Sequence, residues 1–198
     1  MDLIKLSILA GIFIGIAAFG YVVNPIIGIF LFIFGLSAVV SYGAKLFTGT
    51  AGYFYIDTLD LPKLFFVILP FNIIGCLLVY LFTQYTTVDI IPTIESIINK
   101  RQELQWYGCI TMGIGCGILM TTAVEFARRG KEFGNWIPLL FAVPLFIHCG
   151  FPHCIADAFY YIVYIFNFDI NWNIILCYIC TVFGNFIGCN IPRIFVVD

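Results

Sequence analysis

Charged residues in this chain are spaced so far apart that long stretches contain none. No charge lies between Lys5 and Lys45, whereas a helix needs only about 20 apolar residues to cross a bilayer. That stretch is too long for one crossing, and the turn-forming pair Asn24-Pro25 divides it. The sequence therefore predicts a first spanning helix at about 6–23 and a second that starts near 25.

The composition excludes most other classes of protein. Hydrophobic residues make up 62% of the 198 residues and charged residues 10%, against about a quarter charged in soluble proteins. So few charges cannot cover a water-facing surface, and so apolar a chain is not disordered. A net charge of −2 gives no basic footprint for nucleic acid. A polytopic protein in a lipid bilayer remains.

Four further spans follow along the chain, at about 62–84, 106–126, 136–166 and 171–194. The segment between the third and fourth spans contains five charged residues, and we predict it as a polar loop: Asp89, Glu95, Lys100, Arg101 and Glu103. The predicted fold is therefore a single all-α transmembrane domain over residues 1–198 with six helices. Because each half has three spans, the halves 6–84 and 106–195 must be inverted repeats.

Basic residues set the expected orientation, since loops rich in Lys and Arg stay in the cytoplasm. If the N-terminus is cytoplasmic, the only basic residues in the outside loops are Lys100 and Arg101. The inside loops then hold six basic residues: Lys5, Lys63, Arg128, Arg129, Lys131 and Arg193. We predict that both termini are cytoplasmic and that the protein lies in the cell membrane, plasma or inner.

The second and fifth spans are each interrupted by glycines, polar groups and, in the fifth, a proline. Residues 41–50 read SYGAKLFTGT and residues 148–157 read HCGFPHCIAD. Non-helical backbone at membrane depth persists only when it is buried in protein or lines a cavity. Gly and Pro are common in membrane helices, but two matched breaks point to a substrate site near the midplane. Half-helices that start at such breaks favour an anion.

Three motifs resemble the formate/nitrite transporter family. Residues 43–50, GAKLFTGT, are similar to the family pattern G-A-D/E-L-F-T-G/S-N/T, and residues 150–158, GFPHCIADA, to G-F-E-H-S/C-I/V-A-N-M. Residues 184–188, GNFIG, match the last-span pattern G-N-I/F-I/V-G. The first span at 10–17 is also similar, so the resemblance covers nearly the whole chain.

The resemblance implies an aquaporin-like fold, a homopentamer with one pore in each protomer, and transport of formate or nitrite that can be proton-coupled. A hydrosulfide-selective channel of the same fold is the alternative. The family's pore histidine falls on His153 and its threonine partner on Thr48. Apolar gates fall on Leu36 and Phe146 toward the cytoplasm and on Leu46 and Phe47 near the loop. The predicted substrate pore thus holds His153, Thr48, Lys45 and Asn185, with Arg101 at the outer mouth.

Four positions depart from the family pattern. Lys45 replaces an acidic residue, Pro152 replaces the Glu before the histidine, Asp157 replaces an Asn, and Gly117 stands where the fourth span usually has Asn. These changes leave the choice of anion open.

Two side chains carry hypotheses of their own. His153 has an ordinary pKa near 6.5, and we hypothesise that an anion approaches it and crosses the apolar constriction as the neutral acid, because a bare charge in hydrocarbon is costly. Lys45 either attracts the anion, pairs with Asp157, or extends its long side chain to a subunit interface.

Two other functions stay open. A channel for neutral solutes is disfavoured because the NPA motifs of aquaporins are absent. A membrane-embedded metal-binding protein would use His148, Cys149, His153, Cys154 and Asp157, but the two histidines lie five residues apart across a proline. The pair Cys177 and Cys180 lies mid-span, where a redox role is disfavoured. We expect no cofactor, no metal and no enzymatic activity.

Overall fold

The computed structural model describes residues 2–52, 61–130 and 132–195, so Lys131 lies outside it. The described residues are helical and contain no strand. The first half comprises α1 (Leu3–Val23), α2 (Pro25–Leu31), α3 (Ile33–Ser41), α4 (Phe47–Ala51), and a continuous stretch of α5 (Leu61–Lys63), the π-helix η1 (Leu64–Ile68) and α6 (Leu69–Thr83). The second half comprises α7 (Ile91–Arg129), α8 (Phe133–His148), α9 (Cys154–Ile165) and α10 (Trp172–Phe195).

Four helical stretches are long and apolar enough to cross a membrane: 3–23, 61–83, 91–129 and 172–195. Three shorter apolar stretches, 25–41, 133–148 and 154–165, flank the two predicted breaks. The all-helical membrane fold predicted from the sequence is confirmed. The count of six crossings and the division into inverted repeats stay predictions.

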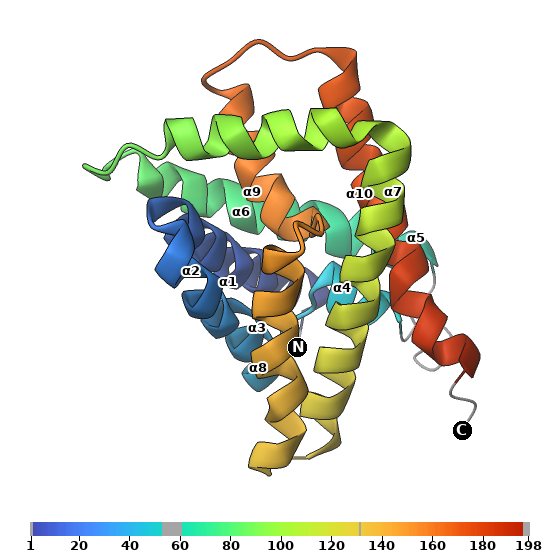
Figure 1. The fold of residues 1–198 in the computed structure, drawn as a ribbon. Helices are drawn as coiled ribbons and strands as arrows, with labels where there is room; N and C mark the ends of the chain where they lie inside the picture. Colours follow the sequence, from blue (N-terminus) through green and yellow to red (C-terminus); the bar gives the residue numbers. More distant parts are fainter. Residues whose placement is uncertain (1, 53–60, 131, 196–198) are drawn as a thin grey trace.

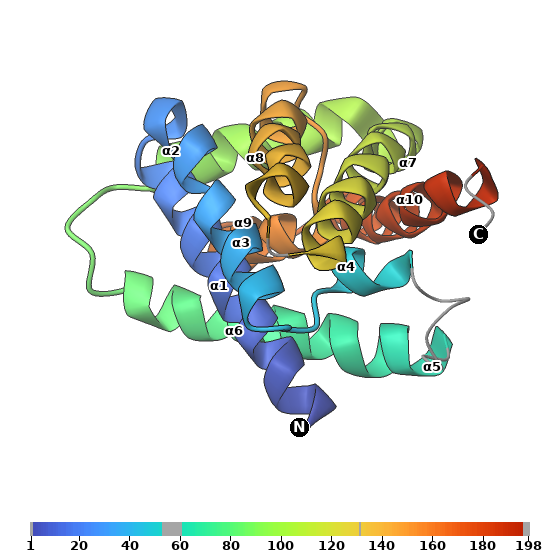
Figure 2. The same ribbon diagram turned by 90° about the horizontal axis from the view of Figure 1, so that it is seen from below.

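Long helices pack in pairs around two short central ones. Helix α1 packs on α6, and α10 packs on α7, as Figures 1 and 2 show. Both pairs of helices approach closely at a glycine. A Cβ atom added to Gly11 would lie 2.0 Å from the carbonyl oxygen of Asn72. A Cβ atom added to Gly188 would lie 2.1 Å from the carbonyl oxygen of Ile114. All five residues of α4 and the first turns of α9 are buried. An apolar helix that is buried on every face belongs in the centre of a bundle.

The predicted polar loop between the third and fourth spans is instead mostly helix, a correction to the sequence interpretation. Helix α7 begins at Ile91 and bends at Gln105, where φ is 58° and ψ is 175°. Figure 1 shows residues 91–104 running across the rest of α7. Ile94 and Ile98 are fully buried one turn apart. This apolar face explains why a segment rich in charge folds as an amphipathic helix.

Candidate functional site

Both breaks end a helix in the same way. Gly43 after α3 has a φ of 61°, and Gly150 after α8 has a φ of 69°. In each break the next amide N–H donates to a helix carbonyl five residues back, at 2.9 Å. This is the Schellman closure, in which glycine takes the left-handed conformation. The chain is then extended for a few residues before a second helix starts.

The second break is held by Asn185, a side chain of α10 that is 0% exposed. Its Oδ1 accepts from the Cys154 N–H at 2.8 Å. Its Nδ2 donates to the carbonyl oxygens of Pro152 at 2.8 Å and Gly113 at 3.0 Å. All of its hydrogen-bonding partners are backbone groups, and it does not line the cavity described below. Asn185, predicted as a pore residue, therefore positions the break.

The first break is held by Asn72 of α6 through an equivalent set of bonds. Asn72 Oδ1 accepts from the Phe47 N–H at 2.8 Å, and its Nδ2 donates to the carbonyls of Lys45 at 2.9 Å and Ser7 at 2.7 Å. Asn72 is not among the predicted site residues. The signal for it is a repeated motif, because residues 72–76 read NIIGC and residues 185–189 read NFIGC.

His153 and Thr48 meet at the junction of the two breaks. His153 Nε2 and Thr48 Oγ1 are 2.9 Å apart, and both side chains are buried. His153 also caps its own helix, since its Nδ1 accepts from the Ala156 N–H at 3.1 Å. A neutral imidazole that accepts at Nδ1 carries its proton on Nε2. His153 therefore donates to Thr48, whose own hydroxyl hydrogen is left to bind another group.

A cavity of about 340 Å³ leads to this histidine. The residues that line it include His153, Phe151, Arg101, Lys100 and Tyr160. Basic side chains from α7 thus face the same space as the histidine from the second break. The predicted outer-mouth residue and the predicted pore histidine share one cavity.

Arg101 forms a clamp across this cavity. Its Nε donates to Asp157 Oδ2 at 3.0 Å and its Nη2 to Oδ1 at 3.2 Å, while Nη1 donates to the Gly150 carbonyl at 3.0 Å. The side chains are 12% and 1% exposed. Such a two-pronged pair is strong and directional. The suggested pairing of Lys45 with Asp157 is therefore wrong, because Arg101 occupies both oxygens of the carboxylate.

Lys45 lies at the first break and has no ion pair among the described residues. Its backbone N–H donates to the Leu6 carbonyl at 3.1 Å, and its residue is half-buried. Residues 41–43 beside it are exposed. The ammonium group is thus a cation near an open loop, with its charge uncompensated there.

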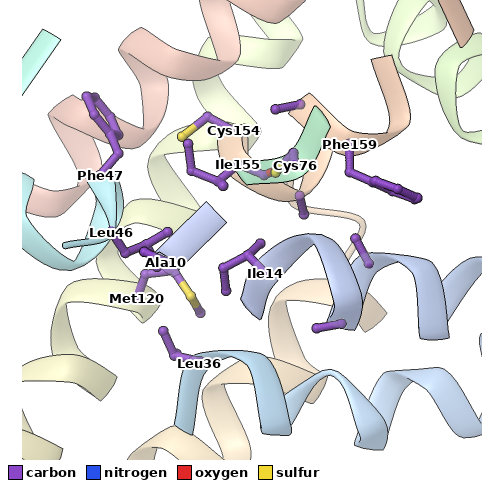
Figure 3. Close-up of a cluster of buried hydrophobic side chains, with 14 of the residues drawn as sticks. Ala10, Ile14, Leu36, Leu46, Phe47, Cys76, Met120, Cys154, Ile155 and Phe159 are labelled. Atoms are coloured by element: carbon purple, nitrogen blue, oxygen red, sulfur yellow. The ribbon is translucent and has the colours of Figure 1, made fainter. Parts of the chain in front are cut away.

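The predicted apolar gates fall in two places. Phe146 lines the cavity with Arg101 and packs edge-on against Phe32, with ring centroids 5.6 Å apart. The predictions of a cytoplasmic side for Phe146 and an outer mouth for Arg101 place on opposite sides two residues that line the same cavity, and which side the cavity faces stays a prediction. The other gate residues are fully buried, and Figure 3 shows Leu36 and Leu46 on either side of Met120.

The metal-site alternative gains no support from the geometry. His148 and Cys149 are exposed, whereas His153 and Cys154 are buried. Within residues 2–52, 61–130 and 132–195, no group of three or more His, Cys, Asp or Glu side chains could hold a metal ion.

Residues 1–196 match the family model described as formate/nitrite transporter. The chain belongs to the formate/nitrite transporter family. Membership identifies it as a multi-pass membrane protein of the channel and transporter class rather than an enzyme, as the sequence predicted.

Curated family members are distant in sequence. A probable formate transporter of Methanothermobacter thermautotrophicus is 28% identical, over 86% of this chain and 77% of that protein. A formate-nitrite transporter of Plasmodium falciparum is 23% identical over 80% of this chain. This chain spans 63% of the Plasmodium protein's length, so it is shorter than that relative.

Solved structures share the fold. A pentameric formate channel with formate bound has a TM-score of 0.79 at 23% identity, covering 98% of this chain and 94% of that one. A second structure, an ion channel of the same family, has a TM-score of 0.83 at 16% identity, with coverages of 99% and 90%. These matches show that this chain has the fold of the formate/nitrite family channels.

Proposed function

We propose that the protein conducts small monovalent anions, formate or nitrite, through a pore in each protomer of a homopentamer in the cell membrane. The observation that carries this proposal is the hydrogen bond of Thr48 with His153, a residue that lines the same cavity as Lys100 and Arg101. The family match and the fold shared with a pentameric formate channel support it.

The path begins in the cavity beside Arg101 and Lys100. Asp157 compensates the charge of Arg101, so the positive charge of Lys100 raises the local concentration of anions in the cavity. The anion then reaches the Thr48 hydroxyl, which has a hydrogen free to donate because its oxygen already accepts from His153. Thr48 is therefore the proposed hydrogen-bond donor to the substrate, and His153 orients it.

The crossing of the apolar region is proposed to take place in the neutral form of the substrate. Leu36, Leu46 and Phe47 are fully buried and offer no polar atom from their side chains, so an anion there would lose its hydration without compensation. Protonation of His153 at Nδ1 would break its bond from the Ala156 N–H. Water in the cavity is accordingly the proposed source of the proton.

Reconstituted liposomes test the function directly. Uptake of formate, nitrite and hydrosulfide would be measured between pH 5 and pH 8, with wild type and His153→Phe in parallel. We expect formate or nitrite uptake that rises as the pH falls, and loss of that uptake in the variant. Hydrosulfide uptake alone would replace the proposed substrate, and unchanged uptake in His153→Phe would remove the histidine from the path.

Orientation and assembly have separate tests. Both termini are proposed to be cytoplasmic, so the Arg101 cavity opens outward. Cys149 is the exposed cysteine next to Gly150 of that cavity, and an impermeant maleimide added outside intact cells should label it but not Cys149→Ser. Labelling only after the cells are opened would reverse the orientation. Native mass spectrometry should give five copies per particle.

A further inference from the structure

Three cysteine thiols gather between α7 and α10. Cys109, Cys177 and Cys180 form a buried cluster that is separate from the main apolar core. The thiols of Cys109 and Cys177 interact with each other, and all three cysteines are free. None of them lines the cavity beside His153. Two helices that pack along their length thus bring two thiols together from distant parts of the sequence.

Cys109 is linked to the cavity through the backbone of Arg101. The Cys109 thiol donates to the Arg101 carbonyl at 3.4 Å. Between these residues lies Gln105, whose φ of 58° is unusual for a side chain other than glycine. The guanidinium of the same Arg101 holds Asp157 and the Gly150 carbonyl. One residue therefore contacts the cysteine cluster with its backbone and shapes the cavity with its side chain.

We propose that Cys109 and Cys177 form a reversible disulfide that loosens the Arg101 clamp and so changes anion flux. The effect on flux rests on the proposed function, whereas the disulfide itself does not. Once the sulfur of Cys109 is bonded to Cys177, it has no hydrogen to donate to the Arg101 carbonyl. The bend at Gln105 then loses one of the contacts that fix residues 91–104 over the cavity.

The chemistry needs an oxidant, and a small uncharged disulfide is the class that fits a buried pair. One cysteine attacks the reagent disulfide as a thiolate, which releases one reagent thiol and leaves a mixed disulfide. The other cysteine then attacks the protein sulfur and releases the second reagent thiol. The two cysteines lose two electrons and two protons in total, and the reagent gains both.

Purified protein in liposomes would be treated with 2,2′-dipyridyl disulfide, alkylated, digested and analysed by mass spectrometry. We expect a peptide pair joined through Cys109 and Cys177 in wild type and in Cys180→Ser, and none in Cys177→Ser. Formate uptake should change by roughly fivefold on oxidation, the size of one neutral hydrogen bond. It should recover on reduction and stay constant in Cys177→Ser.

Each outcome decides one part of the proposal. A Cys177–Cys180 linkage, or no linkage involving Cys109, would overturn the disulfide. A Cys109–Cys177 linkage with unchanged uptake in an active protein would overturn the coupling to Arg101. If wild type transports none of the three anions even when reduced, the proposed function fails while the linkage found by mass spectrometry still stands.

Discussion

The two breaks share a backbone and differ in their chemistry. Both close a helix on a left-handed glycine, and both are bracketed by a buried asparagine that binds the first N–H of the next helix. At the residue before that helix, however, the first break has Leu46 and the second has His153. Only His153 caps its helix with a side chain. The repeated backbone supplies a scaffold, and single side chains on it supply the site.

The cations at the breaks differ as well. Arg101 at the second break is paired with a buried carboxylate, whereas Lys45 at the first has no partner among the described residues. Paired charge orders a cavity without adding net potential, while unpaired charge attracts anions. The comparison teaches that two breaks with the same backbone differ in whether their cation is compensated.

The largest effect is expected from removing either asparagine. Asn185→Leu leaves the Cys154 N–H and two carbonyls without partners in a buried site, which costs at least about 3 kcal/mol. Asn72→Leu should cost a similar amount because its bonds are equivalent. Thermal unfolding in detergent measures both. A stable Asn72→Leu beside an unstable Asn185→Leu would break the equivalence of the two breaks.

Asp157→Asn should have the next largest effect. The change removes the charge that compensates Arg101, so we expect a stability loss of about 3 kcal/mol. It also leaves a net positive charge in the cavity. The formate concentration at half-maximal uptake should therefore fall by roughly threefold to tenfold, and less at high salt. Asp169→Asn, at an exposed position, is the control and should change neither quantity.

A comparison of Thr48→Val with Thr50→Val distinguishes the effect of the hydroxyl that bonds His153 from the effect of packing in the same helix. Thr48 bonds His153, whereas the Thr50 hydroxyl donates only to the backbone carbonyls of Leu46 and Phe47. Valine at 48 leaves the buried His153 Nε2–H unpaired and removes the proposed donor, so uptake should fall about tenfold. Valine at 50 should change uptake less than twofold. Equal losses in the two variants would show that packing, not the hydroxyl, matters.

Lys45→Glu is expected to have the smallest effect. Reversal of a half-exposed charge should raise the formate concentration for half-maximal uptake by roughly twofold to fivefold at low salt. Lys45→Gln should give about half of that change on a logarithmic scale, and Lys5→Gln should give none. If Lys45→Glu leaves uptake kinetics untouched at low salt, the lysine has a structural role.

Much of the fold could be predicted because hydropathy and breakers act locally. Helices in the structure begin or end close to where the apolar runs end, at the pair Asn24-Pro25 and at the two interruptions. The helical character of residues 91–104 was not predicted, since its charges hid an apolar face that includes Ile94 and Ile98. An i, i+4 search of that segment would have found it.

Pairing across the bundle could not be predicted in this way. Nothing local indicates that Asp157 meets Arg101 rather than Lys45, or that Phe146 shares a cavity with Arg101. The role of Asn72 could have been inferred only by aligning NIIGC with NFIGC and noting that each would bracket a break.

The sequence alone determined that this chain crosses a membrane, where its helices are interrupted and to which family it is similar. It could do so because too few charges exclude a water-facing surface and because glycine and proline act on their own backbone. The tertiary structure decided which side chains meet: His153 with Thr48, Arg101 with Asp157, and Cys109 with Cys177. Those contacts join residues far apart in the chain, and helix packing alone sets the distances between them.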